Sequence, residues 1–148
     1  MWSKDFDGWN DYQKIIQGAH HEVYFQERDM WWCSVGANIG HEQDGHHEQY
    51  VRSVLILRGF SQQSFWGVPI STKLKPANPY YLAFDIPSGQ FSALISQMRL
   101  LDAKRLIRRL YTMPQIVFSE IQLAIIRVVV KPRKINGLSV EGPRIPKE

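Results

Sequence analysis

The stretch VRSVLILRGF at residues 51–60 decides the fold, because it contains the clearest strand pattern in the chain. Its apolar run from Val54 to Leu57 has no polar break. This run predicts a strand over residues 51–58 that is buried on both faces. Such a strand needs other elements packed on each side of it, so we expect the rest of the chain to be arranged around it.

Four other segments are rich in β-branched and aromatic residues and are separated by turn residues, which predicts strands. They are residues 29–35, 64–70, 80–86 and 90–100. Five short strands with turns between them favour a small β-barrel. The polar, glycine-containing residues 36–50 predict a long loop, and long loops in compact domains often carry function.

The period of the apolar residues changes to a helical one after residue 101. Residues 102–111 predict a first C-terminal helix and residues 114–130 a second. Thr112 and Gln115 have the spacing of a capping box for the second helix. The fold class that these patterns predict is α+β, mainly β, with an N-terminal helix and two C-terminal helices around the barrel.

The two ends of the chain differ from the strands. Residues 5–17 place apolar side chains at three-to-four spacing, which predicts the N-terminal helix. The tail, residues 131–148, has no sustained period, and we expect it to be loosely ordered. We expect a single domain over residues 1–148, with residues 1–20 as a helical extension and residues 28–128 as the core.

The charge is distributed unevenly along the chain. Residues 1–50 hold 3 Lys or Arg against 9 Asp or Glu, whereas residues 99–148 hold 11 against 4. A basic half can attract a polyanion such as a nucleic acid through phosphate contacts. A solvated basic helix and tail would produce the same charge, so the charge alone does not identify a partner.

Composition also limits the classes of protein that fit. The single cysteine, Cys33, excludes an internal disulfide and a paired-cysteine metal site. No two of the five histidines have the spacing of a closed zinc site, so we predict no metal ion and no cofactor. No apolar run is long enough to span a bilayer and no secretory signal is visible. We therefore expect a soluble cytoplasmic protein.

Four segments arrive in one order: MWWCSVGANIGHEQDG (30–45), RSVLILR (52–58), FWGVPISTK (65–73) and LISQMRLLDAKRL (94–106). Together they resemble the MazF/PemK family of toxin–antitoxin ribonucleases over roughly residues 28–128. The resemblance implies a small SH3-like β-barrel, similar to those of CcdB and MazF, that is usually a homodimer. It implies cleavage of single-stranded RNA without a metal ion, by attack of the 2′-hydroxyl on the adjacent phosphate. The products are a cyclic phosphate and a free 5′-hydroxyl, and the partner is a cognate, often acidic, antitoxin.

Three residues match catalytic positions of that family. Arg52 matches its arginine, whose fork of donors suits the negative charge that builds on a phosphate during attack. Ser71 matches a threonine or serine that can bond a phosphate oxygen or orient the 2′-hydroxyl. His41, in GHEQ, matches a histidine that can move a proton near neutral pH. Without the resemblance these are a strand-start arginine, a turn serine and a loop histidine.

Six further residues are candidate RNA contacts: Gln43, Asp44, Thr72, Lys73, Gln97 and Arg99. Gln43 and Asp44 can read base edges of unstacked RNA. Thr72 and Lys73 can hold the phosphates on either side of the cut. Gln97 and Arg99 match the family's QxR segment, in which Arg99 is a candidate phosphate contact and Gln97 either contacts RNA or braces the loop.

Two departures from the family pattern keep other functions open. Ser53 stands where many members have proline, which affects the local geometry alone. Ser96 stands where PemK-type members have an acidic residue, so an RNA-binding module without catalysis remains an alternative. A gyrase poison of the CcdB kind is a second alternative. Those proteins end in Trp-Gly-Ile, whereas this chain ends in Ile-Pro-Lys-Glu, which argues against that role.

Overall fold

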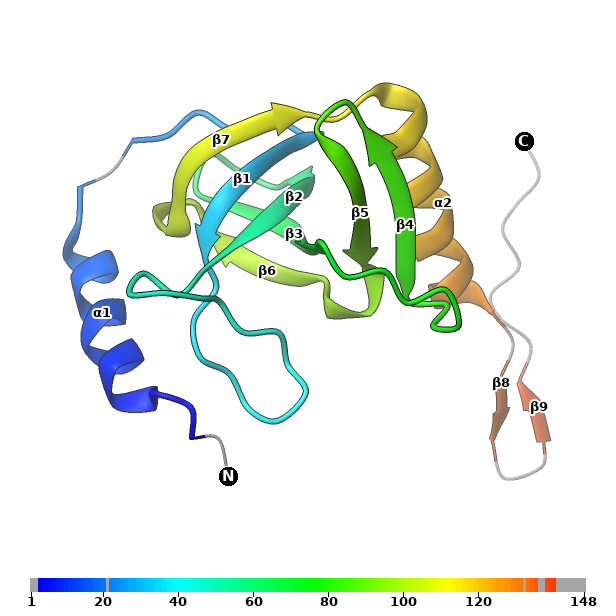
Figure 1. The fold of residues 1–148 in the computed structure, drawn as a ribbon, viewed down its shortest axis with the longest axis horizontal. Coiled ribbons are helices and arrows are strands. Elements are labelled where there is room, and N and C mark those ends of the chain that lie inside the picture. Colours follow the sequence, from blue (N-terminus) through cyan, green and yellow to red (C-terminus); the bar gives the residue numbers. More distant parts are fainter. Residues whose placement is uncertain (1–2, 21, 132, 136–137, 141–148) are drawn as a thin grey trace.

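The computed structural model of the chain describes residues 3–20, 22–131, 133–135 and 138–140. Its elements are α1 (Phe6–Gly18), β1 (Asp29–Ser34), β2 (Val51–Gly59), β3 (Ser64–Ser71), β4 (Tyr81–Ile86), β5 (Gly89–Leu94), η1 (Ile95–Gln97), β6 (Arg99–Asp102), η2 (Ala103–Arg105), β7 (Leu106–Thr112), α2 (Gln115–Val130), β8 (Arg133–Ile135) and β9 (Leu138–Val140). Figure 1 shows a twisted sheet with α2 along one side, and α1 beside the loop between β1 and β2.

The sheet has seven strands in the order β4-β5-β3-β2-β1-β7, with β6 also paired to β3. Strand β3 pairs with β6 at Ser64–Gly67 and with β5 at Ile70 and Ser71, so two strands share one of its edges. Within the described residues no pairing joins β4 to β7, so the sheet is not closed into a barrel and the expected SH3-like β-barrel is not confirmed. Helix α2 packs against β4 and covers the apolar face, which buries that face without a closing pair of strands.

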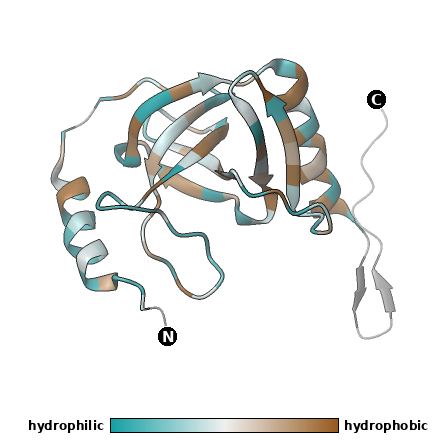
Figure 2. Cartoon of the chain, in the orientation of Figure 1, coloured by the Kyte–Doolittle hydropathy of each residue, from teal (hydrophilic) through white to brown (hydrophobic). Residues whose placement is uncertain are grey.

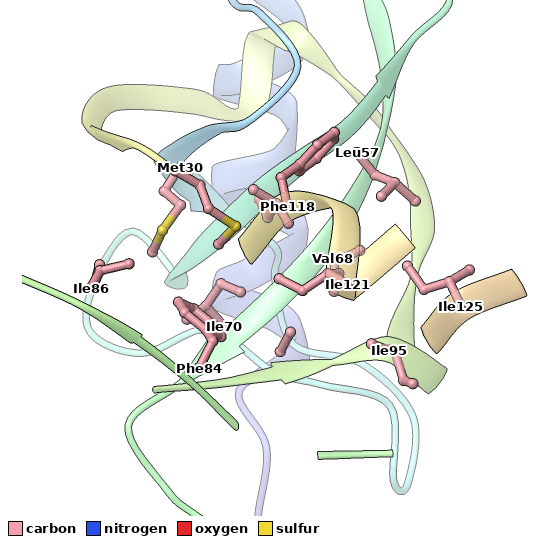
Figure 3. Close-up of a cluster of buried hydrophobic side chains, with 13 residues drawn as sticks. Met30, Leu57, Val68, Ile70, Phe84, Ile86, Ile95, Phe118, Ile121 and Ile125 are labelled. Atoms are coloured by element: carbon pink, nitrogen blue, oxygen red, sulfur yellow. The ribbon is translucent and has the colours of Figure 1, made fainter. Parts of the chain in front are cut away.

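Strand β2 lies between two clusters of buried apolar side chains, as its sequence predicts. Leu55 and Leu57 point into the cluster under α2, and Val54 and Ile56 point into the cluster on the other face. All four are at most 7% exposed. Figure 3 shows the first cluster, in which Phe118, Ile121 and Ile125 of α2 lie against Val68 and Ile70 of β3. Burial of this surface is the main source of stability.

The first of the two predicted C-terminal helices is absent. Residues 102–111 instead form the short 3-10 turn η2 and strand β7, which pairs with β1. Asp102 does cap the turn, because its side chain accepts a hydrogen bond from the Lys104 backbone N–H. Leu106 is buried at 1% exposure opposite Cys33, so pairing with a distant strand overrides the local helical spacing.

The predicted strand over residues 90–100 is also divided. The 3-10 turn η1 separates β5 from β6, because the chain turns a corner there between two different pairings with β3.

The second predicted helix is confirmed as α2, but the predicted capping box is wrong. The N-cap is Pro114, and no side chain caps the helix. Thr112 belongs to β7, and its hydroxyl donates to the buried Asp29 carboxylate at 2.8 Å. Helix α1 agrees with its prediction, and Asp5 caps it by accepting from the Gly8 N–H at 2.9 Å.

Part of the predicted tail forms a hairpin, in which β8 pairs antiparallel with β9. Residues 132, 136–137 and 141–148 of that tail lie outside the described residues. Among the helices that are described, none is long and apolar enough to cross a membrane.

Candidate functional site

The loop of residues 36–50 folds back on itself and brings its end to the start of β2. His46 and Val51 exchange both of their backbone hydrogen bonds, at 2.8 and 2.9 Å. The Gly45 N–H donates to the Gly36 carbonyl at 2.8 Å. A Cβ at Gly45 would lie 1.7 Å from the Tyr50 carbonyl oxygen, so this crossing requires glycine. Figure 2 shows that the loop is mostly hydrophilic, in contrast to the strands of the sheet.

A groove of about 460 Å³ opens between this loop, the start of β2 and the end of β3. Six of the nine predicted site residues line it: Arg52, Ser71, Gln43, Asp44, Thr72 and Lys73. His46, the half-buried Trp32, Lys75 and Tyr81 are among the other residues that line it. The Lys75 ammonium lies 4.7 Å from the centre of the Tyr81 ring. The groove therefore combines cations, hydroxyl groups and aromatic faces.

Arg52 is fixed at the floor of this groove by three contacts. Its Nε donates to the Asp44 carbonyl at 2.9 Å and its Nη1 to the Ile70 carbonyl at 3.4 Å. Its Nη2 lies 3.1 Å from Nε2 of His46. Burial lowers the pKa of this guanidinium, and the neighbouring Tyr81 and Asp44 oppose that shift. Arginine nevertheless remains charged in proteins, so the groove holds a positioned cation.

His46 is a site residue that the sequence did not identify. Its pKa is lowered from the usual value, first by burial and then by the positive Arg52, while Asp44 opposes the shift. A guanidinium can only donate, so the neutral ring accepts at Nε2 and carries its proton on Nδ1. The sequence contains one signal for this placement, the glycine directly before His46, which permits the tight return of the loop.

Ser71 ends β3 beside the arginine. Its Oγ accepts a hydrogen bond from the Lys73 N–H at 3.1 Å, which fixes the turn that follows the strand. Arg52 bonds the carbonyl of Ile70, the residue before Ser71. Arg52 and Ser71 therefore face the same groove, although they are 19 positions apart in the chain.

The other three predicted site residues lie elsewhere. Gln97 and Arg99 line a second hollow of about 390 Å³, which shares Gln43 with the groove. Gln97 braces the loop, because its Oε1 accepts from the Gln43 N–H and its Nε2 donates to the His41 carbonyl, at 3.2 and 3.0 Å. His41 is exposed and lines neither hollow.

The described part of the chain contains no group of three or more His, Cys, Asp or Glu side chains arranged to hold a metal ion. His21 lies outside the described residues. Cys33 is fully buried, and burial raises the pKa of its thiol to about 12. The groove brings together Arg52, His46, Ser71 and Lys73.

The fold and the groove together define a small, mainly β protein with a cationic site suited to a phosphate group. Residues 26–129 match the family of PemK-like, MazF-like toxins of type II toxin–antitoxin systems, and the chain belongs to that family. No curated protein matches the sequence significantly. The fold is similar to a solved structure described as an endoribonuclease in complex with its cognate antitoxin from a mycobacterial species. The TM-score is 0.55 and the identity 12%, over 74% of this chain and 99% of the other.

Proposed function

We propose that this protein is an endoribonuclease that cuts single-stranded RNA without a metal ion, as the toxin of a toxin–antitoxin pair. The observation that carries the proposal is the convergence of Arg52, Ser71 and Lys73 on one groove. The family match and the likeness in fold to an endoribonuclease support it. Because its substrate is cellular RNA, we expect the protein to act in the cytoplasm and to inhibit translation and growth.

The groove suits the attack of a ribose 2′-hydroxyl on the adjacent phosphate. The attack builds negative charge on the phosphate oxygens, and the Arg52 guanidinium is held in place to receive that charge. The Ser71 hydroxyl can donate to the same phosphate or orient the 2′-hydroxyl. Lys73 and Thr72 stand next along the groove, where they can hold the following phosphate. The 2′-oxygen then bonds to phosphorus as the bond to the 5′-oxygen breaks.

A proton must leave the 2′-hydroxyl during this step, and His46 is the best-placed acceptor. Its Nε2 lone pair points at the Arg52 guanidinium in the free protein. When a phosphate takes over that guanidinium, Nε2 becomes free to accept the 2′-proton, and water can protonate the leaving 5′-oxygen. His41 remains the alternative that the GHEQ motif suggests, but its side chain would have to reach the groove from outside.

The proposal is tested by incubating the purified protein with single-stranded RNA of mixed sequence in EDTA. We expect cleavage by the wild type and a loss of about 100-fold to 1000-fold in the Arg52→Ala variant. The matched control is Arg58→Ala, which removes an arginine from the far end of β2, where a 65% exposed side chain lies 3.7 Å from Glu27. Uncut RNA across many sequences, or equal activity in both variants, would refute the proposal.

An RNA-binding module without catalysis is the alternative that Ser96 keeps open. Position 96 holds a serine in place of the acidic residue of PemK-type members, and it lines the second hollow rather than the groove of Arg52. In the same experiment this alternative predicts retarded but intact RNA on a native gel.

Two partners belong to the proposal. A cognate antitoxin with an acidic segment would compete with RNA for the cationic groove, so we expect it to inhibit cleavage. A second copy of the chain would cover the apolar side chains that α2 exposes, namely Ile116, Leu123, Ile126 and Val129. Light scattering of the purified protein should then give the mass of a homodimer, about twice that of one chain of 17.3 kDa.

A further inference from the structure

Helix α1 lies outside the segment that matches the toxin family, yet it is attached to both ends of the loop of residues 36–50. Its one buried residue, Trp9, packs on Gly36 at the start of the loop and on Tyr50 at its end. A Cβ at Gly36 would lie 2.3 Å from the indole ring, and φ there is +92°. The Arg105 guanidinium lies over the same ring, 5.5 Å from its centre. The loop is thus closed over an aromatic residue that α1 supplies.

The residues just before α1 hold the loop by polar contacts. The Lys4 ammonium forms an ion pair with the Asp44 carboxylate at 2.9 Å. It also donates to the backbone carbonyls of Asn38 and Gly40. One cation therefore ties together three positions of the loop, and Asp5 adds a fourth contact by accepting from the Tyr50 hydroxyl at 2.8 Å.

Asp44 connects this anchor to the site. One of its carboxylate oxygens pairs with Lys4, and the other accepts from the Asn38 N–H at 2.6 Å. Its backbone carbonyl accepts from the Nε of Arg52. Two steps of direct contact therefore lead from Lys4 to the guanidinium. Asp44 also lines the groove proposed for phosphates, where its carboxylate would repel the substrate if Lys4 did not pair with it.

The burial of the pair separates it from an ordinary surface contact. The side chains of Lys4 and Asp44 are 18% and 22% exposed. The ion pair within α1, Lys14 with Asp11, is 4.0 Å long with side chains 71% and 79% exposed. Exposed pairs of that kind contribute little to structure, whereas a partly buried cation with three oxygen partners constrains its surroundings.

We propose that Lys4 is a positioning residue of the nuclease site, and that the N-terminal segment acts as a strap which holds the loop of residues 36–50 in its working shape. Lys4 orders Asp44, which aligns Arg52, and it cancels the Asp44 charge that would oppose RNA. The expected effect of Lys4 on activity rests on the proposed function. The expected effect on the order of the loop is independent of that function, because it follows from the contacts that Lys4 makes with the loop.

The experiment compares Lys4→Met with Lys14→Met, which removes a lysine of the same segment from the exposed pair. In RNA cleavage we expect Lys4→Met to lower kcat by about tenfold, since small misplacements of a catalytic group have effects of that order or more. Lys4→Arg should retain most of the activity, and Lys14→Met should match the wild type. The melting temperature of Lys4→Met should stay within about 4 °C of the wild type, as for the loss of one partly buried contact.

Amide hydrogen exchange gives a second readout that needs no activity. The Asn38 amide, which donates to Asp44, should exchange about tenfold faster in Lys4→Met, while the Val54 amide in β2 stays protected. Equal kcat and equal Asn38 exchange in the two methionine variants would overturn the inference. If the wild type cuts no RNA, the proposed function fails, and the exchange comparison still decides whether Lys4 orders the loop.

Discussion

The apolar cluster under α2 and the loop of residues 36–50 keep their shapes by different means. The cluster contains thirteen buried apolar side chains, drawn from β2, β3, β4, α2 and other elements, so its geometry depends on many contacts rather than on one. In the loop, single polar contacts determine the geometry, such as Asp44 to Arg52 and Gln97 to Gln43. The comparison teaches that changes in the first region should affect stability, whereas changes in the second should affect activity.

The largest effect is expected in the cluster. Ile121 is fully buried, and we expect Ile121→Ala to lower the free energy of unfolding by about 2–5 kcal/mol, because it leaves a cavity. Ile15→Ala in α1 removes an isoleucine side chain that is 66% exposed and should change that free energy by about 0.5 kcal/mol. Urea unfolding measures both. A loss of kcat in the folded fraction of Ile121→Ala would contradict the view that the cluster controls stability and the loop controls activity.

At His46 we expect a smaller effect, which lowers activity rather than stability. We expect His46→Gln to lower kcat by about 100-fold while the unfolding midpoint changes little. The pKa of His46 is lowered from 6.5, so the ring stays neutral at pH 7 and becomes charged only below that value. The wild-type rate should therefore fall as the pH drops below about 6.5, and this acid limb should be absent from His46→Gln.

The free energy of unfolding of the wild type should also fall as the pH is lowered. Because the unfolded chain binds the His46 proton at a higher pH than the folded chain does, stability from this group is present above pH 6.5 and is lost as the pH falls below 6.5 and through the lower pKa of the folded chain. If His41→Gln rather than His46→Gln abolishes the acid limb, the motif and not the groove identifies the proton acceptor.

At Ser71 we expect about a tenfold loss of kcat in Ser71→Ala, the size of one hydrogen bond to a charged group. Ser71→Thr keeps the hydroxyl and should restore most of the activity. Rates for the two variants on the same RNA decide the point. Equal rates would show that the hydroxyl only fixes the turn at Lys73.

The smallest effect is expected at Cys33, where the result should be no reaction. The thiol is fully buried with a pKa raised to about 12, so almost no thiolate forms near neutral pH. Mass spectrometry after iodoacetamide treatment should find the native protein unmodified and the urea-unfolded protein alkylated once. Rapid alkylation of the native chain would show that this part of the sheet opens easily.

The sequence predicts β2 and the helix α2 well because their apolar periods match their burial. Val54 to Leu57 read as a strand buried on both faces, and both faces are covered. The helix that the sequence predicts over residues 102–111 is wrong, because the spacing of their apolar residues suits a helix while Leu106 is buried opposite Cys33 by pairing with β1. Pairing across more than 70 positions cannot be seen in a local period.

The site was predicted in part for a similar reason. Arg52 and Ser71 follow from the resemblance to a family, and their common groove agrees with it. His46 was missed because its place depends on how the loop returns to Val51, which no motif records. The role of Lys4 was also invisible, since its partner Asp44 lies 40 positions away on a different element.

The most direct test of the proposed chemistry uses one RNA oligonucleotide in two forms, with and without a 2′-hydroxyl at the nucleotide before the cut. Both are incubated with the wild type in EDTA, and the products are analysed by mass spectrometry. We expect the unmodified RNA to give a 2′,3′-cyclic phosphate and a 5′-hydroxyl, and the 2′-deoxy form to stay intact at that bond. Cleavage of the deoxy form, or a 5′-phosphate on the product, would contradict attack by the 2′-hydroxyl in the groove of Arg52.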